Sequence, residues 1–264
     1  MKLANHLVDD LLEMQIKGGP WGYEFDVQTR WGYYPKGSPN VVATAYALRA
    51  ISSVDRIEEV SDSVREWLGS LWDPRGFFRY TLESDALIHN GSLLAAESLA
   101  RLGGFDDRIP KAIETTVSAQ DDVGSWPYGR GAGLEWKDSF HTIYVMDSLS
   151  FLEKHGFDIG TSVETGLEYW KQHFFTEAMR PTYFADSKAP SRDVHNVATV
   201  AGAMIDYRKF GLDQHFIDSV LGYLVEFQAN DGGFRNSANS LPFMRWNQGH
   251  AFLALSKHIA AARN

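Results

Sequence analysis

The stretch Asp138-Ser139-Phe140-His141-Thr142 opens an apolar run that extends to Lys154, and comparable polar stretches recur along the chain. Each of these stretches stands where a helix is expected to begin. Equivalent positions lie 49, 52, 54 and 50 residues apart, counted from Asn40 through His89, His141 and His195 to Arg245. A period near 50 residues with two helices per unit is typical of a repeat architecture rather than of separate domains.

Two kinds of helix alternate within this period. Five runs are apolar almost all round and are expected to be buried, and the runs between them are apolar on one face only. The final helix is as apolar as the middle ones, whereas an open solenoid would end in a polar capping repeat. We therefore predict an all-α fold, an α/α toroid of about five helical hairpins forming a single domain over residues 1–264. The expected buried helices span 40–51, 89–102, 138–154, 193–209 and 243–261, and the amphipathic helices span 3–16, 57–71, 108–119, 161–174 and 214–227.

Three of the breaks between helices share a motif with the same spacing of its glutamine, glycine and aromatic positions. The three copies are Gln15-x-x-Gly18-Gly19-Pro20-Trp21, Gln120-x-x-Val123-Gly124-Ser125-Trp126 and Gln228-x-x-Asp231-Gly232-Gly233-Phe234. It resembles the Gln-x-x-Asp-Gly-x-Trp repeat of squalene and terpene cyclases and protein prenyltransferases, which are α/α toroids. The resemblance covers the whole chain and implies the same fold, with five hairpins instead of the usual six. Beyond short hairpins in these aromatic loops, we expect no strands.

The chemistry of those enzymes is not implied by the resemblance. The chain has neither the Asp-x-Asp-Asp acid motif nor the Asp-Asp-x-x-Asp magnesium motif, and without cysteine it cannot form the prenyltransferase zinc site. A closer resemblance is to uncharacterised toroid proteins from bacterial surface-polysaccharide gene clusters. It implies a polysaccharide context but no reaction, and it is carried by Trp126–Gly129, Asp138–Thr142, Asp193–His195 and Met244–Gln248.

Charge and hydropathy narrow the classes of partner. The formal net charge is -9 and no basic block occurs, which argues against nucleic acid as a partner. No stretch of about 18 apolar residues predicts a membrane span, and residues 1–10 lack the apolar core of a signal peptide. We expect a soluble, cytoplasmic protein, and its oligomeric state is left open. Aromatic residues make up 13% of the chain, which suits a core and also a sugar- or isoprenoid-binding cavity.

The candidate site is the set of buried-helix starts. If the ring closes, these ends meet at one mouth, where helix dipoles and free N–H groups favour anions such as carboxylates or phosphates. His89, His141 and His195 then occupy equivalent positions and suit proton transfer near neutrality. Arg245 offers a bidentate fork for a carboxylate or phosphate.

Asp138, His141 and Tyr144 follow one another at intervals of three residues and share a helical face. The carboxylate is placed to orient the imidazole, and the phenol could act as an acid or a base. Asp138 and Asp193 could equally be helix caps, and the histidines could be structural residues that the repeats reuse. Further candidates for substrate binding are Asn90, Trp246, Gln248, Trp136 and Tyr128.

Three histidines with Asp138 could also bind a divalent metal, although no short His-x-x-x-His spacing supports this, and we predict no cofactor. The leading hypothesis is a carbohydrate-active enzyme of the lyase or epimerase type that acts on a uronate, by fold-level analogy with helical toroids that use Asn, His, Arg and Tyr. A hydrolase variant would require Glu135 or Asp138 to face Asp193. The alternatives are a terpenoid-cyclase-like or isoprenoid-binding toroid, and a non-catalytic glycan-binding scaffold.

Overall fold

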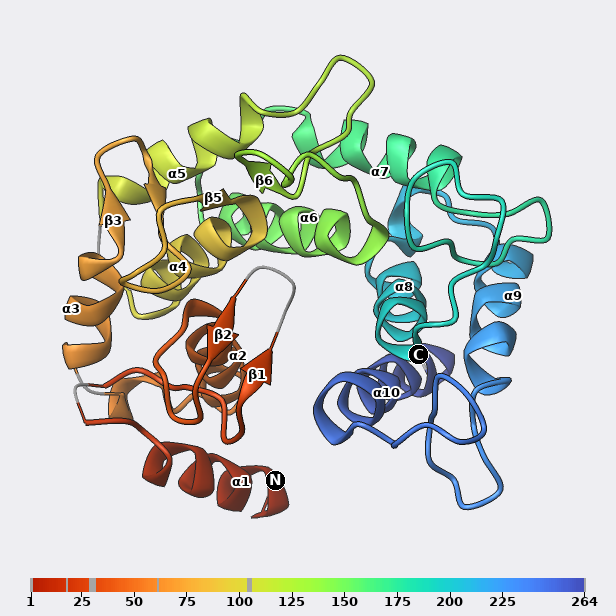
Figure 1. Ribbon diagram of the computed structural model, residues 1–264, viewed down its shortest axis with the longest axis horizontal. Helices are drawn as coiled ribbons and strands as arrows, with labels where there is room; N and C mark the ends of the chain where they lie inside the picture. Colours follow the sequence, from red (N-terminus) through yellow and green to blue (C-terminus); the bar gives the residue numbers. More distant parts are fainter. Residues whose placement is uncertain (1, 18, 29–31, 61, 104–105, 264) are drawn as a thin grey trace. The chain divides into compact units, whose positions relative to one another are not determined.

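The computed structural model describes residues 2–17, 19–28, 32–60, 62–103 and 106–263 (Figure 1). Gly18, the fourth residue of the first loop motif, lies outside these ranges. Backbone packing divides the chain into two compact units, which are described separately. Unit 1 comprises Met1–Asp121, Pro127–Glu135 and Val145–Val163, and unit 2 comprises Asp122–Trp126, Trp136–Tyr144 and Glu164–Asn264. The single-domain organisation stays a prediction.

Helices dominate both units, so the all-α prediction is confirmed. The elements of unit 1 are α1 (Lys2–Glu13), β1 (Val27–Gln28), β2 (Tyr33–Tyr34), α2 (Val41–Ser52), η1 (Ile57–Glu59), α3 (Asp62–Ser70), β3 (Trp72–Asp73), β4 (Phe77–Phe78), β5 (Leu87–Ile88), α4 (His89–Arg101), α5 (Arg108–Val117) and β6 (Gly129–Arg130). Those of unit 2 are α8 (Val194–Asp206), η2 (Arg208–Phe210), α9 (Gln214–Val225), η3 (Met244–Gly249) and α10 (His250–Ala262). The helices α6 (Ser139–Lys154) and α7 (Ser162–His173) contribute residues to both units.

The helices expected to be buried form the core of each unit. In unit 1, α4 packs against α2 and α5, and every one of its side chains from His89 to Leu99 is buried. In unit 2, α8 packs against α9 and α10 and is buried from Asn196 to Met204 (Figure 1). Small residues such as Gly202, whose position faces Ala254 of α10, let these helices approach closely.

Two of the expected helices differ from their predicted course. The run 57–71 is divided into η1 and α3, and 243–261 begins with a turn of π-helix, η3, before α10. The prediction that the last helix is buried all round is also wrong. Only Ala251 and Ala254 of α10 are buried, because α10 packs along one side on α8 and leaves Phe252 75% exposed.

The loop motifs act as structural staples. The side-chain amide of Gln15 donates to the carbonyl of Gly19 at 3.0 Å, and that of Gln228 donates to Gly232 at 3.1 Å. Both glycines have positive φ, which a residue with a side chain rarely adopts. The aromatic positions Trp21, Trp126 and Phe234 are all buried, so they belong to the core.

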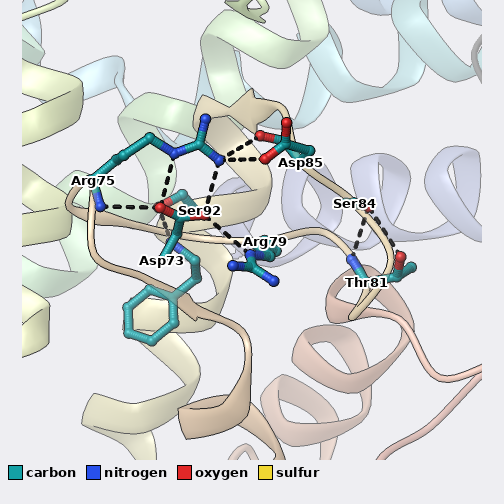
Figure 2. A network of polar contacts seen from close by, with 8 residues as sticks. Asp73, Arg75, Arg79, Thr81, Ser84, Asp85 and Ser92 are labelled. Carbon is teal, nitrogen blue, oxygen red and sulfur yellow. Dashed lines mark hydrogen bonds and ion pairs between the residues drawn. The ribbon is translucent and has the colours of Figure 1, made fainter.

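A corresponding hairpin in the second repeat uses charge instead of an amide. Asp73, at the end of β3, is buried and accepts hydrogen bonds from the guanidinium groups of Arg75 and Arg79 (Figure 2). Arg75 also reaches the carboxylate of Asp85. The hydrogen bonds from Arg75 hold the pKa of Asp73 well below its usual value. Asp231 and Arg235 repeat this pairing in the last loop.

The strands are confined to the loops, as expected, but β5 and β6 come from two different loops and so do not form a hairpin. The pairs β1–β2, β3–β4 and β5–β6 are each two residues long and antiparallel. Within the described residues, no helix combines the length and the apolarity needed to cross a lipid bilayer.

A buried ion-pair network joins three core helices of unit 1. Glu97 of α4 is 1% exposed, and its Oε1 accepts from Nε of Arg49 on α2 at 2.8 Å. The same oxygen pairs with Arg101 at 2.7 Å, while Oε2 accepts from the hydroxyl of Ser148 on α6 at 2.9 Å. Burial raises the pKa of Glu97, but the two arginines outweigh it and hold the pKa below its usual value.

Replacing Glu97 by Ala should lower the free energy of unfolding by about 3–5 kcal/mol, because it leaves two guanidinium groups without their shared partner. Urea denaturation followed by circular dichroism measures this change. Glu114→Ala is the matched control, since Glu114 is 64% exposed in its pair with Lys111 and should matter little. Equal effects of the two substitutions would show that the network does not stabilise the unit.

Candidate acid–base site

The second turn of α6 and the first residues of α8 and α10 bring a phenol and two imidazoles together in unit 2. The Oη atom of Tyr144 lies 2.7 Å from Nε2 of His195 and 3.0 Å from Nε2 of His250. The hydroxyl of Thr199, one turn beyond His195, lies 3.4 Å from the same phenol oxygen. The two imidazole rings meet edge to face, with centroids 4.3 Å apart. A side chain that can give or take a proton is therefore held between two others.

Asp138 positions a third imidazole at the start of α6. Its Oδ2 lies 2.6 Å from Nδ1 of His141, and its Oδ1 accepts from the backbone N–H of His141 at 2.9 Å. The indole N–H of Trp136 donates to Oδ2 at 2.9 Å. Asp138 thus both caps the helix and contacts the imidazole of His141. Capping and orientation, which the sequence analysis gave as alternatives, are therefore compatible. The carboxylate side chain is 1% exposed and that of His141 is 21% exposed, which leaves the imidazole as the accessible member.

Aromatic rings pack this cluster together. Phe140 lies between two of the imidazoles, with centroid distances of 4.1 Å to His141 and 4.7 Å to His195. Tyr183 packs on the far side of Phe140 at 5.5 Å. An apolar wedge among polar groups fixes their orientation and lowers the local dielectric constant, so each charge nearby acts more strongly.

The electrostatics keep the imidazoles of His195 and His250 neutral. Burial lowers the pKa of His195 well below its usual value, and the neighbouring His250, His141 and Arg245 lower it further. Burial also lowers the pKa of His250, and the positive charge of Arg245 adds to this effect. At neutral pH both rings therefore lack a positive charge, and Arg245 supplies the cation of the cluster.

His250 was missed by the sequence reasoning, which stopped at Arg245 because this residue is equivalent to the histidines of earlier repeats. The π-helix η3 explains why the two residues act together. The backbone N–H of Gln248 bonds to the carbonyl of Phe243 five residues earlier, and Nδ1 of His250 lies 3.3 Å from the carbonyl of Arg245, again five residues earlier. The sequence signal was a histidine at the start of the last apolar run.

The remaining candidates have other neighbours. The guanidinium of Arg245 lies over the ring of Trp246, 5.2 Å from its centroid. Asp193 caps α8 through the N–H of His195 at 3.0 Å, and burial raises its pKa. Gln248 pins the backbone of Phe234 with two hydrogen bonds of 2.9 and 2.7 Å.

Four candidates belong to unit 1. His89 is 1% exposed, and its Nδ1 lies 3.2 Å from the hydroxyl of Thr116. The carbonyl of Tyr128 accepts from the backbone N–H of His89, and the Asn90 side chain is buried beside it. Glu135, the second carboxylate of the hydrolase variant, is exposed. Burial, with a smaller effect of Arg130, lowers the pKa of His89 to about 4.

In the part of the chain that the structure describes, no group of three or more His, Cys, Asp or Glu side chains is arranged to hold a metal ion. The His195 and His250 nitrogens that face each other across the site are both engaged with Tyr144. Phenol and imidazole side chains in contact are groups that can exchange protons.

No known family and no curated protein matches this sequence. Solved structures do match. A possible member of the GH105 family from Salmonella enterica serovar Paratyphi A aligns over 98% of this chain and 77% of its own, with a TM-score of 0.66 and 13% identity. Protein geranylgeranyltransferase-I from Candida albicans, complexed with GGPP, aligns over 81% of this chain and 66% of its own, with a TM-score of 0.56 and 14% identity.

A reducing-end-xylose releasing exo-oligoxylanase, solved as a mutant with xylobiose, aligns over 85% of this chain and 72% of its own. Its TM-score is 0.53 and its identity is 14%. The likeness to these α/α-toroid proteins confirms the predicted fold class.

Replacing His89 by Asn tests how burial of this imidazole affects acid stability. The folded state holds the pKa near 4, against about 6.5 in the unfolded chain, so the unfolded chain binds more protons between these values. The contribution of the neutral imidazole to the free energy of unfolding is fully present above pH 6.5. It falls by roughly 1.4 kcal/mol per pH unit as the pH decreases, and the loss reaches about 3 kcal/mol at pH 4.

Asn keeps a polar atom near Thr116 but does not titrate in this range. Urea denaturation at several pH values should therefore give a stability that falls less steeply between pH 6.5 and 4 in His89→Asn than in the wild type. Comparing slopes removes the constant cost of the smaller side chain. Parallel curves would contradict the neutral, buried state of His89.

Proposed function

We propose that this chain is a carbohydrate-active enzyme that performs acid–base chemistry on an acidic sugar, as a lyase or an epimerase at the carbon next to the carboxylate. The observation that carries this proposal is the phenol oxygen of Tyr144 held within 3.0 Å of two imidazole nitrogens, beside a cation. Proton abstraction next to a carboxylate needs a base, an acid and a positive charge, and unit 2 gathers side chains suited to each role.

Arg245 is assigned to the substrate carboxylate. Its positive charge lowers the pKa of both His195 and His250, which supports a role for this charge beside the acid–base groups. A guanidinium pairs with a carboxylate through two parallel hydrogen bonds, which withdraws charge from the adjacent carbon and makes its C–H bond more acidic. Trp246, under the guanidinium, offers a ring face for a sugar.

Tyr144 and His141 are assigned to the proton transfers. As its phenolate, Tyr144 takes the proton from the carbon next to the carboxylate, and the C–H electron pair passes into the carboxylate as an enediolate. In an epimerase the carbon then receives a proton on its other face; in a lyase the C–O bond one carbon further breaks and its oxygen leaves with the electron pair. The more exposed His141, held by Asp138, is suited in its protonated form to donate a proton to the carbon in an epimerase or to the leaving oxygen in a lyase, which leaves a neutral imidazole.

A sugar substrate is favoured over an isoprenoid by the polarity of the cluster. Three imidazoles and a guanidinium gathered in unit 2 would lose hydration against an apolar chain without gaining partners. Among the structural relatives, the oligoxylanase and the possible GH105 member are named for carbohydrate-active families, although the shared property is the fold. A bacterial surface-polysaccharide context, which the sequence resemblance implies, and a cytoplasmic location, expected from the absence of a signal-peptide pattern, belong to this proposal.

The test uses uronate-containing oligosaccharides in heavy water. The wild type should incorporate deuterium at C5 of the uronate, or release unsaturated products, as measured by mass spectrometry. Tyr144→Phe and Arg245→Ala should each lower the rate by about 10²-fold or more, because one lacks the base and the other the carboxylate partner.

His155→Ala is the matched control for His141→Ala. His155 lies just past the end of α6 and is exposed, and its imidazole stacks on the ring of Phe151 and contacts the carbonyl of the same residue. Its replacement should leave the rate unchanged, while His141→Ala should lower it. Deuterium incorporation that stays the same in Tyr144→Phe, Arg245→Ala and His141→Ala would overturn the proposed function.

A further inference from the structure

The phenol of Tyr144 has two imidazole neighbours but a single proton. Its Oη lies 2.7 Å from Nε2 of His195 and 3.0 Å from Nε2 of His250. A phenol O–H can donate to only one of these nitrogens, and its oxygen must accept from the other. The direction of this donation decides which imidazole can take the proton of Tyr144.

The backbone of η3 decides the direction. Nδ1 of His250 lies 3.3 Å from the carbonyl oxygen of Arg245, and a carbonyl oxygen can only accept. Nδ1 of His250 therefore carries the hydrogen. A neutral imidazole has a single N–H, so Nε2 of His250 has a lone pair and accepts from the Tyr144 hydroxyl.

The second neighbour then has the opposite tautomer. Because the Tyr144 proton points at His250, the phenol oxygen must accept from His195, whose hydrogen is on Nε2. These three side chains form a relay of hydrogen bonds. Nε2–H of His195 donates to Oη of Tyr144, whose O–H donates to Nε2 of His250, and Nδ1–H of His250 donates to the Arg245 carbonyl. Burial, which lowers the pKa of both rings, supports the neutral forms that this relay requires.

We infer that His250 is the proton acceptor of Tyr144 and hence a positioning residue for the reaction, a role that rests on the proposed function. The O–H bond of Tyr144 breaks and its proton passes to Nε2 of His250, which leaves a phenolate beside an imidazolium. The Nε2–H of His195 remains as a donor to the phenolate oxygen and stabilises its charge. The phenolate is then the base for the substrate proton.

The surroundings of the relay set its pH range. The titratable and charged groups around it are His141 of α6, Asp138 just before α6, Asp193 just before α8, Arg245 of η3, and Tyr183, whose pKa is raised by burial and by the two aspartates. Acidification protonates His250 and removes the lone pair that accepts the Tyr144 proton. Activity should therefore fall on the acidic side.

The direct test is the tautomeric state of each histidine in the full chain, measured by long-range ¹H–¹⁵N correlation at pH 7.5. The expected result is a hydrogen on Nδ1 of His250 and on Nε2 of His195. The signals are assigned by their loss in His250→Gln and His195→Gln. The reverse tautomers, or a hydrogen on Nε2 of His250, would overturn the inference, and neither result depends on any substrate or on the proposed activity.

Kinetics of His250→Gln test the consequence for the reaction. The amide oxygen of Gln can still accept from the Tyr144 hydroxyl but cannot take its proton. The expected result is a kcat lowered by about 10²-fold or more, loss of the acidic limb of the pH profile and little change in KM. A pH profile that keeps the acidic limb of the wild type would overturn the inference.

His258→Gln is the matched control on the same helix. His258 lies two turns further along α10, where its Nε2 contacts the carbonyl of Ala201. Its replacement should change neither the tautomers nor the acidic limb. Should the chain have no activity on uronates while the tautomers are as expected, the proposed function fails and the relay stands.

Discussion

The core helices are buried on nearly every side, and this burial determines where polar chemistry can lie. Along α4 every side chain from His89 to Leu99 is buried, and α8 is buried from Asn196 to Met204. A polar group within such a helix needs a partner that the apolar neighbours cannot supply, so polar groups gather at the helix starts. There the same groups satisfy the unpaired backbone N–H groups, as Asn40 does for α2 and Asp193 for α8. Capping and site formation thus occur at the same place.

Much of the fold could be predicted because its signals are local. The alternation of all-round apolar runs with one-sided ones, repeated near every 50 residues, located the core helices to within a few residues, and the glutamine–glycine–aromatic motif placed the loops. The misses have physical reasons. The run 57–71 keeps its helical spacing across a 3₁₀ turn, so periodicity alone cannot reveal the break. The exposure of α10 depends on the neighbours it has in three dimensions, which composition does not specify.

The candidate site was predictable where it follows from spacing within one helix. The i, i+3 interval of Asp138 and His141 is sufficient for their 2.6 Å contact, and Tyr144 follows on the same face. Contacts between helices required the structure. Repeat equivalence selected His195, which contacts Tyr144 in the structure, but the same reasoning selected Arg245 in the last repeat and overlooked His250. Repeat equivalence also treated His89 like the others, whereas its neighbour in unit 1 is a threonine hydroxyl.

The π-helical turn of η3 makes the number of residues as important as their identity. A π-turn contains one residue more than an α-turn, and each residue rotates a helix by about 100°. Removing one residue between Met244 and Gly249 would therefore leave every side chain of the relay in the sequence while turning His250 away from Tyr144. A scan of single substitutions cannot detect this dependence, whereas single-residue deletions can. In related chains, a gap at this point of an alignment would separate proteins that keep the three-residue relay from proteins that share only the fold.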